Sequence, residues 1–272
     1  MRKITSVLVV MGIIGFIVSC AKVPISGRRQ LHLIPESEMM AMSFQAYKEF
    51  LDTNNVLPAN NPNVIMVKRI GSGIEEAVTK FLNDNKQSKR INGFAWEFNV
   101  VQQNAVNAWC MPGGKVVVYT GILEVTQDEP GLAVVMGHEI AHAIARHGNE
   151  RMSQGIALQL GGLALSVALS EKPELTRNIF LQSYGIGTAL GSLAYSRNHE
   201  TEADKMGLVF MAMAGYDPRT AIEFWERMSQ TGGQAPPELL STHPSDETRI
   251  ATLKEFMPQA LKYYMPDSAP QP

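Results

Sequence analysis

The sequence predicts an α+β fold that is mostly helical, with a small antiparallel sheet beside one buried helix. Apolar residues recur at helical spacing in several segments of the 272-residue chain. Only the stretch 94–119 shows the alternation and turn signals of strands. Hydrophobic residues make up 45% of the chain and charged residues 18%, so the chain can bury a sizeable core. The formal net charge of −2, without a block of like charges, gives no sign of nucleic-acid binding.

The first nineteen residues are predicted to be a lipoprotein signal peptide rather than part of the fold. Arg2 and Lys3 give a basic start, and a short apolar run follows over 7–18. An apolar residue at position 17, a small residue at position 19 and then Cys20 resemble the bacterial lipobox, in which the cysteine becomes the lipidated first residue. We therefore expect Cys20 to anchor the chain on the periplasmic side of the bacterial envelope, at the outer membrane rather than the inner one. The alternative is a transmembrane anchor, but the run is shorter than the ~20 residues that span a bilayer.

Residues 20–60 are predicted to form an anchor segment, and residues 61–265 the main domain. The anchor segment carries one amphipathic helix, from Glu36 to Leu51. The main domain opens with a second helix over 64–83, whose apolar residues lie on one stripe. Residues 266–272 are expected to be a disordered tail.

Three strands are predicted in the middle of the chain, at 94–100, 106–110 and 115–119. The turn signal Met111-Pro112-Gly113-Gly114 separates the last two, which indicates a small antiparallel sheet. Cys110 then has no intramolecular partner, so no disulfide is expected.

The remainder of the chain is predicted to be helical. Thr126 and Glu129 have the spacing of a capping box, so the helix beside the sheet is expected to begin there. The apolar segment 155–170 is interpreted as a buried core helix, because it is short for a membrane span. A later helix should end at Gly215, and the last helix should be broken or kinked at Pro258.

The segment Val134–His142 carries the strongest functional signal, because it contains His138, Glu139 and His142. Positions i and i+4 lie on the same face of a helix, so both imidazoles can bind one metal ion. Glu139 lies about 100° further round, too far to be a ligand but well placed to hold a water on the metal. This is the H-E-x-x-H arrangement of a zinc hydrolase, and it predicts one Zn²⁺ per chain. The alternative is two histidines on a helix surface, but apolar residues flank the motif on both sides.

A catalytic zinc needs a third protein ligand, for which we choose Glu200. Glu150 lies eight residues beyond His142, about 12 Å along a helix axis, and is too far away. Glu200 shares a helix face with Ala203 and Gly207, whose small size allows close approach to the metal-binding helix.

The same downstream helix offers further candidates. Asp204 lies one turn after Glu200 and is expected to accept a hydrogen bond from the N–H of a ligand histidine. Glu202 points to another side of the helix and is expected to be solvated. Two alternatives stay open: a three-histidine site that uses His199, and a surface ion pair for Glu200.

Several motifs occur in one order over residues 60–262. They are Asn107-Ala108 with Pro112-Gly113-Gly114, His138–His142, Tyr195-Ser196-Arg197 with Glu200 and Ala203-Asp204, and His243-Pro244 with Arg249-Ile250. In these motifs the chain resembles the zinc metallopeptidases that include the prenyl-protein endopeptidases, the bacterial heat-shock membrane protease and the mitochondrial inner-membrane overlapping-activity protease. The resemblance implies a gluzincin-type endopeptidase with His138, His142 and Glu200 on zinc and Glu139 as the base. The periplasmic, lipid-anchored or soluble members are the most similar branch, so substrate preferences for prenylated peptides are not carried over.

The expected activity is zinc-dependent hydrolysis of peptide bonds. Zinc lowers the pKa of water that it binds towards about 7, and Glu139 accepts the proton and returns it to the leaving amine. The resemblance and the anchor together imply quality control, with unfolded or misassembled envelope proteins as substrates. The alternative is a non-catalytic zinc-containing lipoprotein that acts as an assembly factor or chaperone, and an esterase or amidase acting on cell-wall material is a weaker one.

The tetrahedral oxyanion of such a reaction needs one more donor. The candidates are His243, Tyr195 and Arg197. Pro244 makes the loop of His243 rigid, so this imidazole could donate to the oxyanion. It could also occupy the open zinc position and keep the enzyme latent, or have only a structural role.

Overall fold

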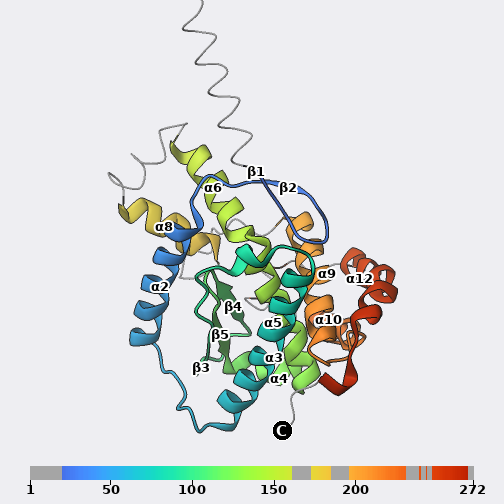
Figure 1. Ribbon diagram of the computed structural model, residues 1–272. Coiled ribbons are helices and arrows are strands. Elements are labelled where there is room, and N and C mark those ends of the chain that lie inside the picture. Colours follow the sequence, from blue (N-terminus) through green and yellow to red (C-terminus); the bar gives the residue numbers. More distant parts are fainter. Residues whose placement is uncertain are drawn as a thin grey trace, which may run out of the picture.

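The computed structural model describes most of the chain (Figure 1), namely residues 20–160, 173–184, 196–230, Leu239, His243 and 247–268. The predicted signal peptide lies outside these residues, as does the part of the predicted helix 155–170 beyond residue 160. The described fold is mostly helical with one three-stranded sheet, which confirms the predicted fold class. Over the described ranges, no helix has both the length and the apolar character needed to cross a membrane.

Helix α5 (Glu129–Ala145) lies at the centre beside the sheet, and the other described helices surround them. These are α2 (Glu36–Thr53), α3 (Pro62–Asp84), α4 (Thr120–Thr126), α6 (His147–Leu160), α8 (Pro173–Ser183), α9 (Arg197–Met213), α10 (Thr220–Gln230) and α12 (Glu247–Ala260). In Figure 1, α5 and the sheet lie between α2 and α8 on one side and α9, α10 and α12 on the other. Helix α12 runs through Pro258 to Ala260, so the helix is not broken at this proline. The fixed φ of proline suits a helix, and only the one hydrogen bond of its missing N–H is lost.

The sheet consists of β3 (Glu97–Val101), β4 (Ala108–Met111) and β5 (Lys115–Tyr119), in the order β3-β5-β4. β4 and β5 form the expected antiparallel pair, but β3 pairs parallel with β5, so the sheet is mixed. The reason is the connection after β3, which crosses to the far side of β5 before β4 begins. The turn between β4 and β5 contains Gly113 and Gly114 at φ +82° and +79°, a conformation that glycine adopts without strain.

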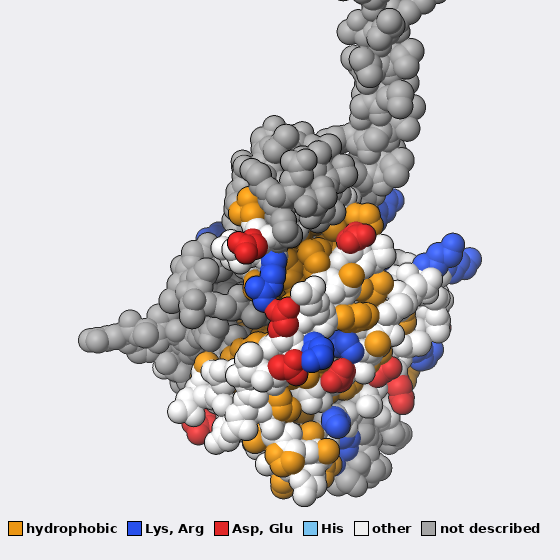
Figure 2. Space-filling view, turned by 90° about the vertical axis from the view of Figure 1, so that its left-hand side faces the viewer, with side chains coloured by type: hydrophobic (Ala, Val, Ile, Leu, Met, Phe, Trp, Pro, Cys, Tyr) orange, Lys and Arg blue, Asp and Glu red, His pale blue; other side chains and the backbone are white. Residues whose placement is uncertain are grey.

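Both faces of the sheet are buried, each in a different core. Val116 and Val118 of β5 belong to the larger core, with residues of α3, α5, α9, α10 and α12. Val117 and Tyr119 belong to a second core, with residues of α2, α6 and α8. This explains why β5 is apolar at successive positions instead of alternating. Figure 2 shows the face on the α2 side, where acidic and basic side chains are interspersed among hydrophobic ones.

Helix α5 begins two residues later than a Thr126 cap would place it. The side chain of Asp128 accepts a hydrogen bond of 2.8 Å from the backbone N–H of Gly131, whereas Thr126 is the last residue of α4. The predicted capping box is therefore wrong, because the aspartate next to the helix start competes for the same backbone donors. At its other end α5 stops at Arg146, which has a left-handed φ of +63°, and α6 follows directly.

Helices α5 and α9 touch through two glycines. A Cβ atom added to Gly207 would lie 3.0 Å from the backbone nitrogen of His138, and one added to Gly137 would lie 3.0 Å from the carbonyl oxygen of Gly207. The backbones therefore meet directly, with no side chain between them. This contact brings the ligand candidates of the two helices to one place.

The N-terminal segment is folded onto the same body. β1 (Cys20–Lys22) and β2 (Arg29–Leu31) form an antiparallel hairpin, and Val23 in its loop is buried in the larger core. At the other end of the chain, Pro266–Ser268 form a short 3-10 turn within the tail that was expected to be disordered, and residues 269–272 lie outside the described part.

Candidate metal centre

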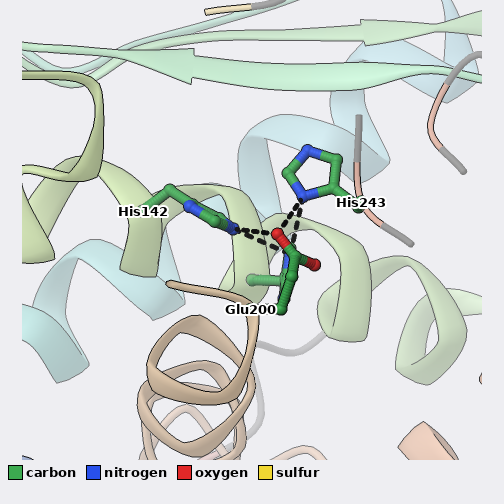
Figure 3. Close-up of side chains that lie close together, drawn as sticks. His142, Glu200 and His243 are labelled. Atoms are coloured by element: carbon green, nitrogen blue, oxygen red, sulfur yellow. Dashed lines mark hydrogen bonds and ion pairs between the residues drawn. The ribbon is translucent and has the colours of Figure 1, made fainter. Parts of the chain in front are cut away.

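Four side chains from three parts of the chain converge beside the sheet. His138 and His142 come from α5, Glu200 from α9, and His243 from the segment between α10 and α12. Each offers one donor atom, and these atoms all lie within 4.8 Å of one another. Figure 3 shows His142, Glu200 and His243 pointing toward a common centre below the strands. All four residues are buried.

The separations between the donor atoms are those of groups that share one ion. His138 Nε2 lies 3.0 Å from His142 Nε2 and 3.6 Å from Glu200 Oε2. His142 Nε2 lies 3.5 Å from Glu200 Oε1. His243 Nδ1 lies 3.2 Å from His138 Nε2 and 3.0 Å from Glu200 Oε1, so it is as close to the group as its members are to one another.

Glu139 lies beside this group without belonging to it. Its carboxylate is buried, and Oε1 has no hydrogen-bond partner among the described residues. In the described part of the chain, Oε1 has an ion-pair contact with His243 Nε2, at 3.6 Å. Burial raises the pKa of Glu139 above its usual range, although His243 and His138 oppose this. A buried carboxylate with a free oxygen and a raised pKa is suited to accept a proton.

The outward nitrogen of His138 is held by a carboxylate. Asp204 Oδ1 lies 2.9 Å from His138 Nδ1, so it can accept a hydrogen bond from this imidazole, as expected from the sequence. Arg249 of α12 donates from Nη2 to Asp204 Oδ1 at 2.6 Å, and its Nη1 lies 3.1 Å from Glu200 Oε2. The guanidinium also stacks on the ring of Trp225, 3.3 Å from its centroid. The sequence offered Arg249 only as part of a motif, and its contact with both carboxylates comes from the structure.

The Nδ1 atom of His142, on the side of the ring away from the ligand group, is held by another histidine. This residue, His147, was not predicted from the sequence. His147 Nδ1 lies 3.0 Å from His142 Nδ1, and His147 Nε2 lies 3.0 Å from Glu202 Oε2. Burial lowers the pKa of His147 to about 4, so this imidazole is neutral at pH 7. The signal available in the sequence was a third histidine five residues after the H-E-x-x-H motif, just past the end of the predicted buried helix.

One expectation for α9 is corrected, and one alternative finds no support. Glu202 is not solvated: it is buried, and it is bound by His147 and by Arg28 of the N-terminal hairpin. His199 is not in the ligand group either, because its Nε2 lies 2.9 Å from Glu150 Oε2. The prediction for Glu202 failed because it treated the far side of α9 as exposed, whereas α6 and the hairpin cover it.

Charge–charge effects at the centre call for a cation. Burial alone would raise the pKa of Glu200, but His243 and Arg249 lower it well below its usual range. Burial would likewise lower the pKa of His243, but the charges of Glu200 and Glu139 raise it. His243 contacts the carboxylates of both glutamates, so a positive charge is favoured beside them.

Comparison with known proteins identifies the family. The family model described as peptidase family M48 matches residues 72–257. The chain belongs to peptidase family M48. It is 35% identical to a mitochondrial metalloendopeptidase OMA1 of Schizosaccharomyces pombe over 242 residues. The alignment covers 88% of this chain and 66% of that protein.

Two further M48 relatives are longer than this chain. The human mitochondrial metalloendopeptidase OMA1 is 32% identical over 248 residues, which are 88% of this chain and 46% of that protein. A beta-barrel assembly-enhancing protease of Escherichia coli is 29% identical over 161 residues, 57% of this chain and 33% of that protein. The chain thus spans between a third and two thirds of these relatives. Membership of M48 confirms the predicted family, and with the relatives' names it supports the predicted metalloendopeptidase.

The M48 chain offers a donor set that fits a metal ion. Three carboxylates, those of Glu139, Glu200 and Asp204, are buried at the centre, and Arg249 is the cation paired with two of them in the described residues. A divalent ion would balance the remaining negative charge and use the imidazole nitrogens that face one another. Of the other two candidate oxyanion donors, Arg197 is exposed at the start of α9, and Tyr195 lies outside the described residues.

Proposed function

We propose that this M48 chain is a zinc-dependent endopeptidase with His138, His142 and Glu200 as the metal ligands. One observation carries the proposal: the donor atoms of these three residues are 3.0 to 3.6 Å apart. Zn–N and Zn–O bonds of about 2.0–2.1 Å in a tetrahedron place ligand atoms about 3.3–3.4 Å apart. Two imidazoles and a carboxylate with no cysteine are the donor set of catalytic rather than structural zinc sites.

When bound, zinc supplies Lewis acidity that polarises the scissile carbonyl and acidifies water. Glu139 is the general base: its unpaired Oε1 faces the ligand group and accepts the proton of the attacking water. The same carboxyl then returns this proton to the leaving amine. Asp204 and Arg249 hold His138 and Glu200 in place, so that the ligands are fixed before substrate arrives.

His243 is proposed to occupy the fourth position of the site and to keep the enzyme latent. Its Nδ1 is as near to His138 Nε2 and Glu200 Oε1 as the three ligands are to one another. Its backbone N–H donates to the carbonyl of Leu239, whose own N–H donates to Val106 O, just before β4. The segment of His243 is therefore attached to the strand edge beside the site, where an extended substrate peptide would add a strand.

The proposed substrates are unfolded or misassembled proteins of the bacterial envelope. The proposed location is the periplasmic side of the envelope, at the outer membrane, with Cys20 as the lipid anchor. The lipobox at Cys20 supports this proposal, and so does the similarity to a protein named for enhancing beta-barrel assembly. Cys20 opens the hairpin, so an anchor there would hold the folded body directly at the membrane surface.

The test is cleavage of an unfolded protein by the purified chain, with and without a chelator. Glu139→Gln is expected to bind zinc as the unchanged chain does and to cleave about 10²–10⁴-fold more slowly, the usual contribution of a general base. Glu124→Gln, at an exposed position of α4, is the matched control and should cleave normally. Near-normal turnover by Glu139→Gln would reject the base. If neither the unchanged chain nor His243→Ala cleaves while both bind zinc, the non-catalytic lipoprotein is the correct alternative.

A further inference from the structure

We propose that Arg28 is a positioning residue for the metal ligand His142, which makes the N-terminal hairpin part of the metal centre. Arg28 lies in the loop between β1 and β2, eight residues after the predicted anchor cysteine and outside the predicted 61–265 domain. It touches neither the ligands nor Glu139 in the described contacts. The inference rests on the proposed metal site. The contacts of Arg28 begin a continuous path of hydrogen bonds to His142.

The Arg28 guanidinium bridges two buried carboxylates on different helices. Its Nη1 and Nη2 donate to Glu150 of α6 at 2.8 and 2.7 Å, which is a bidentate pair. Its Nε and Nη2 donate to Glu202 of α9 at 2.9 and 3.0 Å. Such fork-shaped pairs fix the orientation of both partners, which a single point charge does not. Ser26 of the same loop adds a hydrogen bond of 2.5 Å to Glu202.

The path from Glu202 to the ligand follows from which nitrogens can carry protons. His142 Nε2 belongs to the ligand group, so it must offer its lone pair there, and the ring hydrogen is on Nδ1. Nδ1–H then donates to His147 Nδ1 at 3.0 Å. His147 therefore carries its own hydrogen on Nε2 and donates it to Glu202 Oε2, also at 3.0 Å. A correctly oriented Glu202 thus selects the tautomer in which His142 binds metal through Nε2.

Glu150 supports the same imidazole by a second route. It accepts a hydrogen bond of 2.9 Å from His199 Nε2. The ring of His199 stacks on that of His147, with centroids 4.5 Å apart and planes inclined by 25°. Both carboxylates bound by Arg28 therefore lead to His147, one through a hydrogen bond and the other through a stacked ring.

Loss of the Arg28 charge would remove the group that holds the carboxylates of Glu150 and Glu202 in place. Glu150 and Glu202 are each about nine-tenths or more buried, at 5% and 6% exposure, and they would repel one another without the guanidinium between them. Glu202 would then turn away, and His147 would lose its acceptor. The ring of His142 would consequently be held less firmly in the orientation that binds metal.

The experiment measures metal binding by the full chain and three variants, Arg28→Gln, Arg28→Lys and Arg29→Gln. Zinc affinity is measured by competition with a chromogenic chelator. The visible spectrum of Co²⁺-loaded protein reports the ligand geometry. Arg28→Gln should weaken zinc binding about 10-fold, at the low end for outer supports of a ligand, and change the cobalt spectrum. Arg28→Lys should retain part of the affinity, because one ammonium cannot hold both carboxylates. Arg29, exposed on the same hairpin, is the control and should have no effect.

Thermal unfolding of the metal-free proteins separates positioning from a purely structural role. A lower melting temperature of Arg28→Gln with unchanged zinc affinity and cobalt spectrum would overturn the inference. If Arg28→Gln does not fold, the Arg28→Lys substitution decides: it should weaken zinc binding in the unchanged chain but not in a His147→Phe background, where the path is already cut. Equal loss in both backgrounds would also overturn it. If the unchanged chain binds no zinc, the proposed function fails instead.

Discussion

The two histidines of α5 are one helical turn apart, yet their outward nitrogens are held in different ways. His138 is held directly by Asp204, with Arg249 behind it. His142 is held by a second imidazole, His147, and only then by a carboxylate. The first support is short and consists of α9 and α12. The second is long and runs through α6 and α9 to the N-terminal hairpin.

The difference shows how one helix can connect a metal centre to two parts of a molecule. A carboxylate that contacts the ligand directly keeps its position as long as α5 and α9 stay packed. A support built from three successive side chains depends on every element that contributes one of them. We therefore expect the His142 side of the centre to respond to changes far away in the chain, and the His138 side to respond only to local changes.

The largest expected effect comes from removing a ligand on α9 rather than a support. Glu200→Ala should lose most of the bound zinc, because one of three protein ligands is gone. Glu202→Ala, two residues further on, should lose less, because it acts only through His147. Metal analysis of the two purified variants checks this. Equal zinc contents would contradict the assignment of Glu200 as the ligand.

His243 tests whether the centre is closed by a fourth group. His243→Ala is expected to cleave an unfolded substrate faster than the unchanged chain, because the fourth position of the site becomes free. A rate that falls by about 10²–10³ would instead identify an oxyanion donor. An unchanged rate would leave His243 a structural role. Steady-state kinetics on one unstructured substrate distinguish the three outcomes.

Asp204→Ala breaks the short support and sharpens the comparison directly. Its loss leaves His138 Nδ1 without its acceptor and Arg249 without one of its two carboxylates. Zinc affinity should fall towards the upper end of the 10–100-fold range reported for such supports. The zinc affinity of Glu202→Ala should fall by an amount towards the lower end of that range. If chelator competition gives the reverse order, the long support is the more important one.

Acid should weaken the long support. Burial lowers the pKa of His147 from 6.5 to about 4, so between these values the unfolded chain binds a proton that the folded chain does not. The free energy of unfolding therefore falls as pH falls from 6.5 to 4, by up to about 1.4 kcal/mol per pH unit. Burial raises the pKa of Glu150 and Glu202, but hydrogen bonds from Arg28 and their histidine partners lower it to about 2. Their contribution is present above pH 4.5 and is lost as pH falls towards 2, so both effects have the same sign.

Urea unfolding of the metal-free chain at pH 7 and pH 5 measures this loss. His147→Asn removes the buried imidazole and should show a smaller decrease between the two pH values. A decrease of the same size in both proteins would show that other groups cause the acid sensitivity.

The sequence was sufficient to place together the parts of the candidate site that lie on one helix face. His138 and His142 follow from their spacing, and Glu200 and Asp204 follow from the face of α9 that carries Ala203 and Gly207. These residues need only local geometry and one helix contact. His147, Glu202 and Arg28 could not be connected, because they are 55 and 174 residues apart along the chain. No helical period reports which distant loop covers the far side of a helix.

The fold shows the same limit. Helices α2 and α3 and the three strands of the sheet were predicted to within three residues, because apolar spacing and turn glycines act locally. Helix α4 was not predicted, and α6 begins eight residues before the predicted helix 155–170. The parallel pairing of β3 with β5 was not predicted either, because it depends on how the chain crosses after β3. Nor could the alternation of β5 between two cores be read from its sequence, since a strand buried on both faces loses the polar–apolar period.

The glycine contact between α5 and α9 has a consequence for protein engineering. Replacing glycine by alanine inside helices is an ordinary way to raise thermal stability, by up to about 1 kcal/mol at each position. At Gly137 and Gly207 the added methyl group would press on backbone atoms, which cannot rotate away as a side chain would. A thermostable variant designed by helix propensity alone would push apart the two helices that carry the ligands. These two positions should therefore be excluded from such a design.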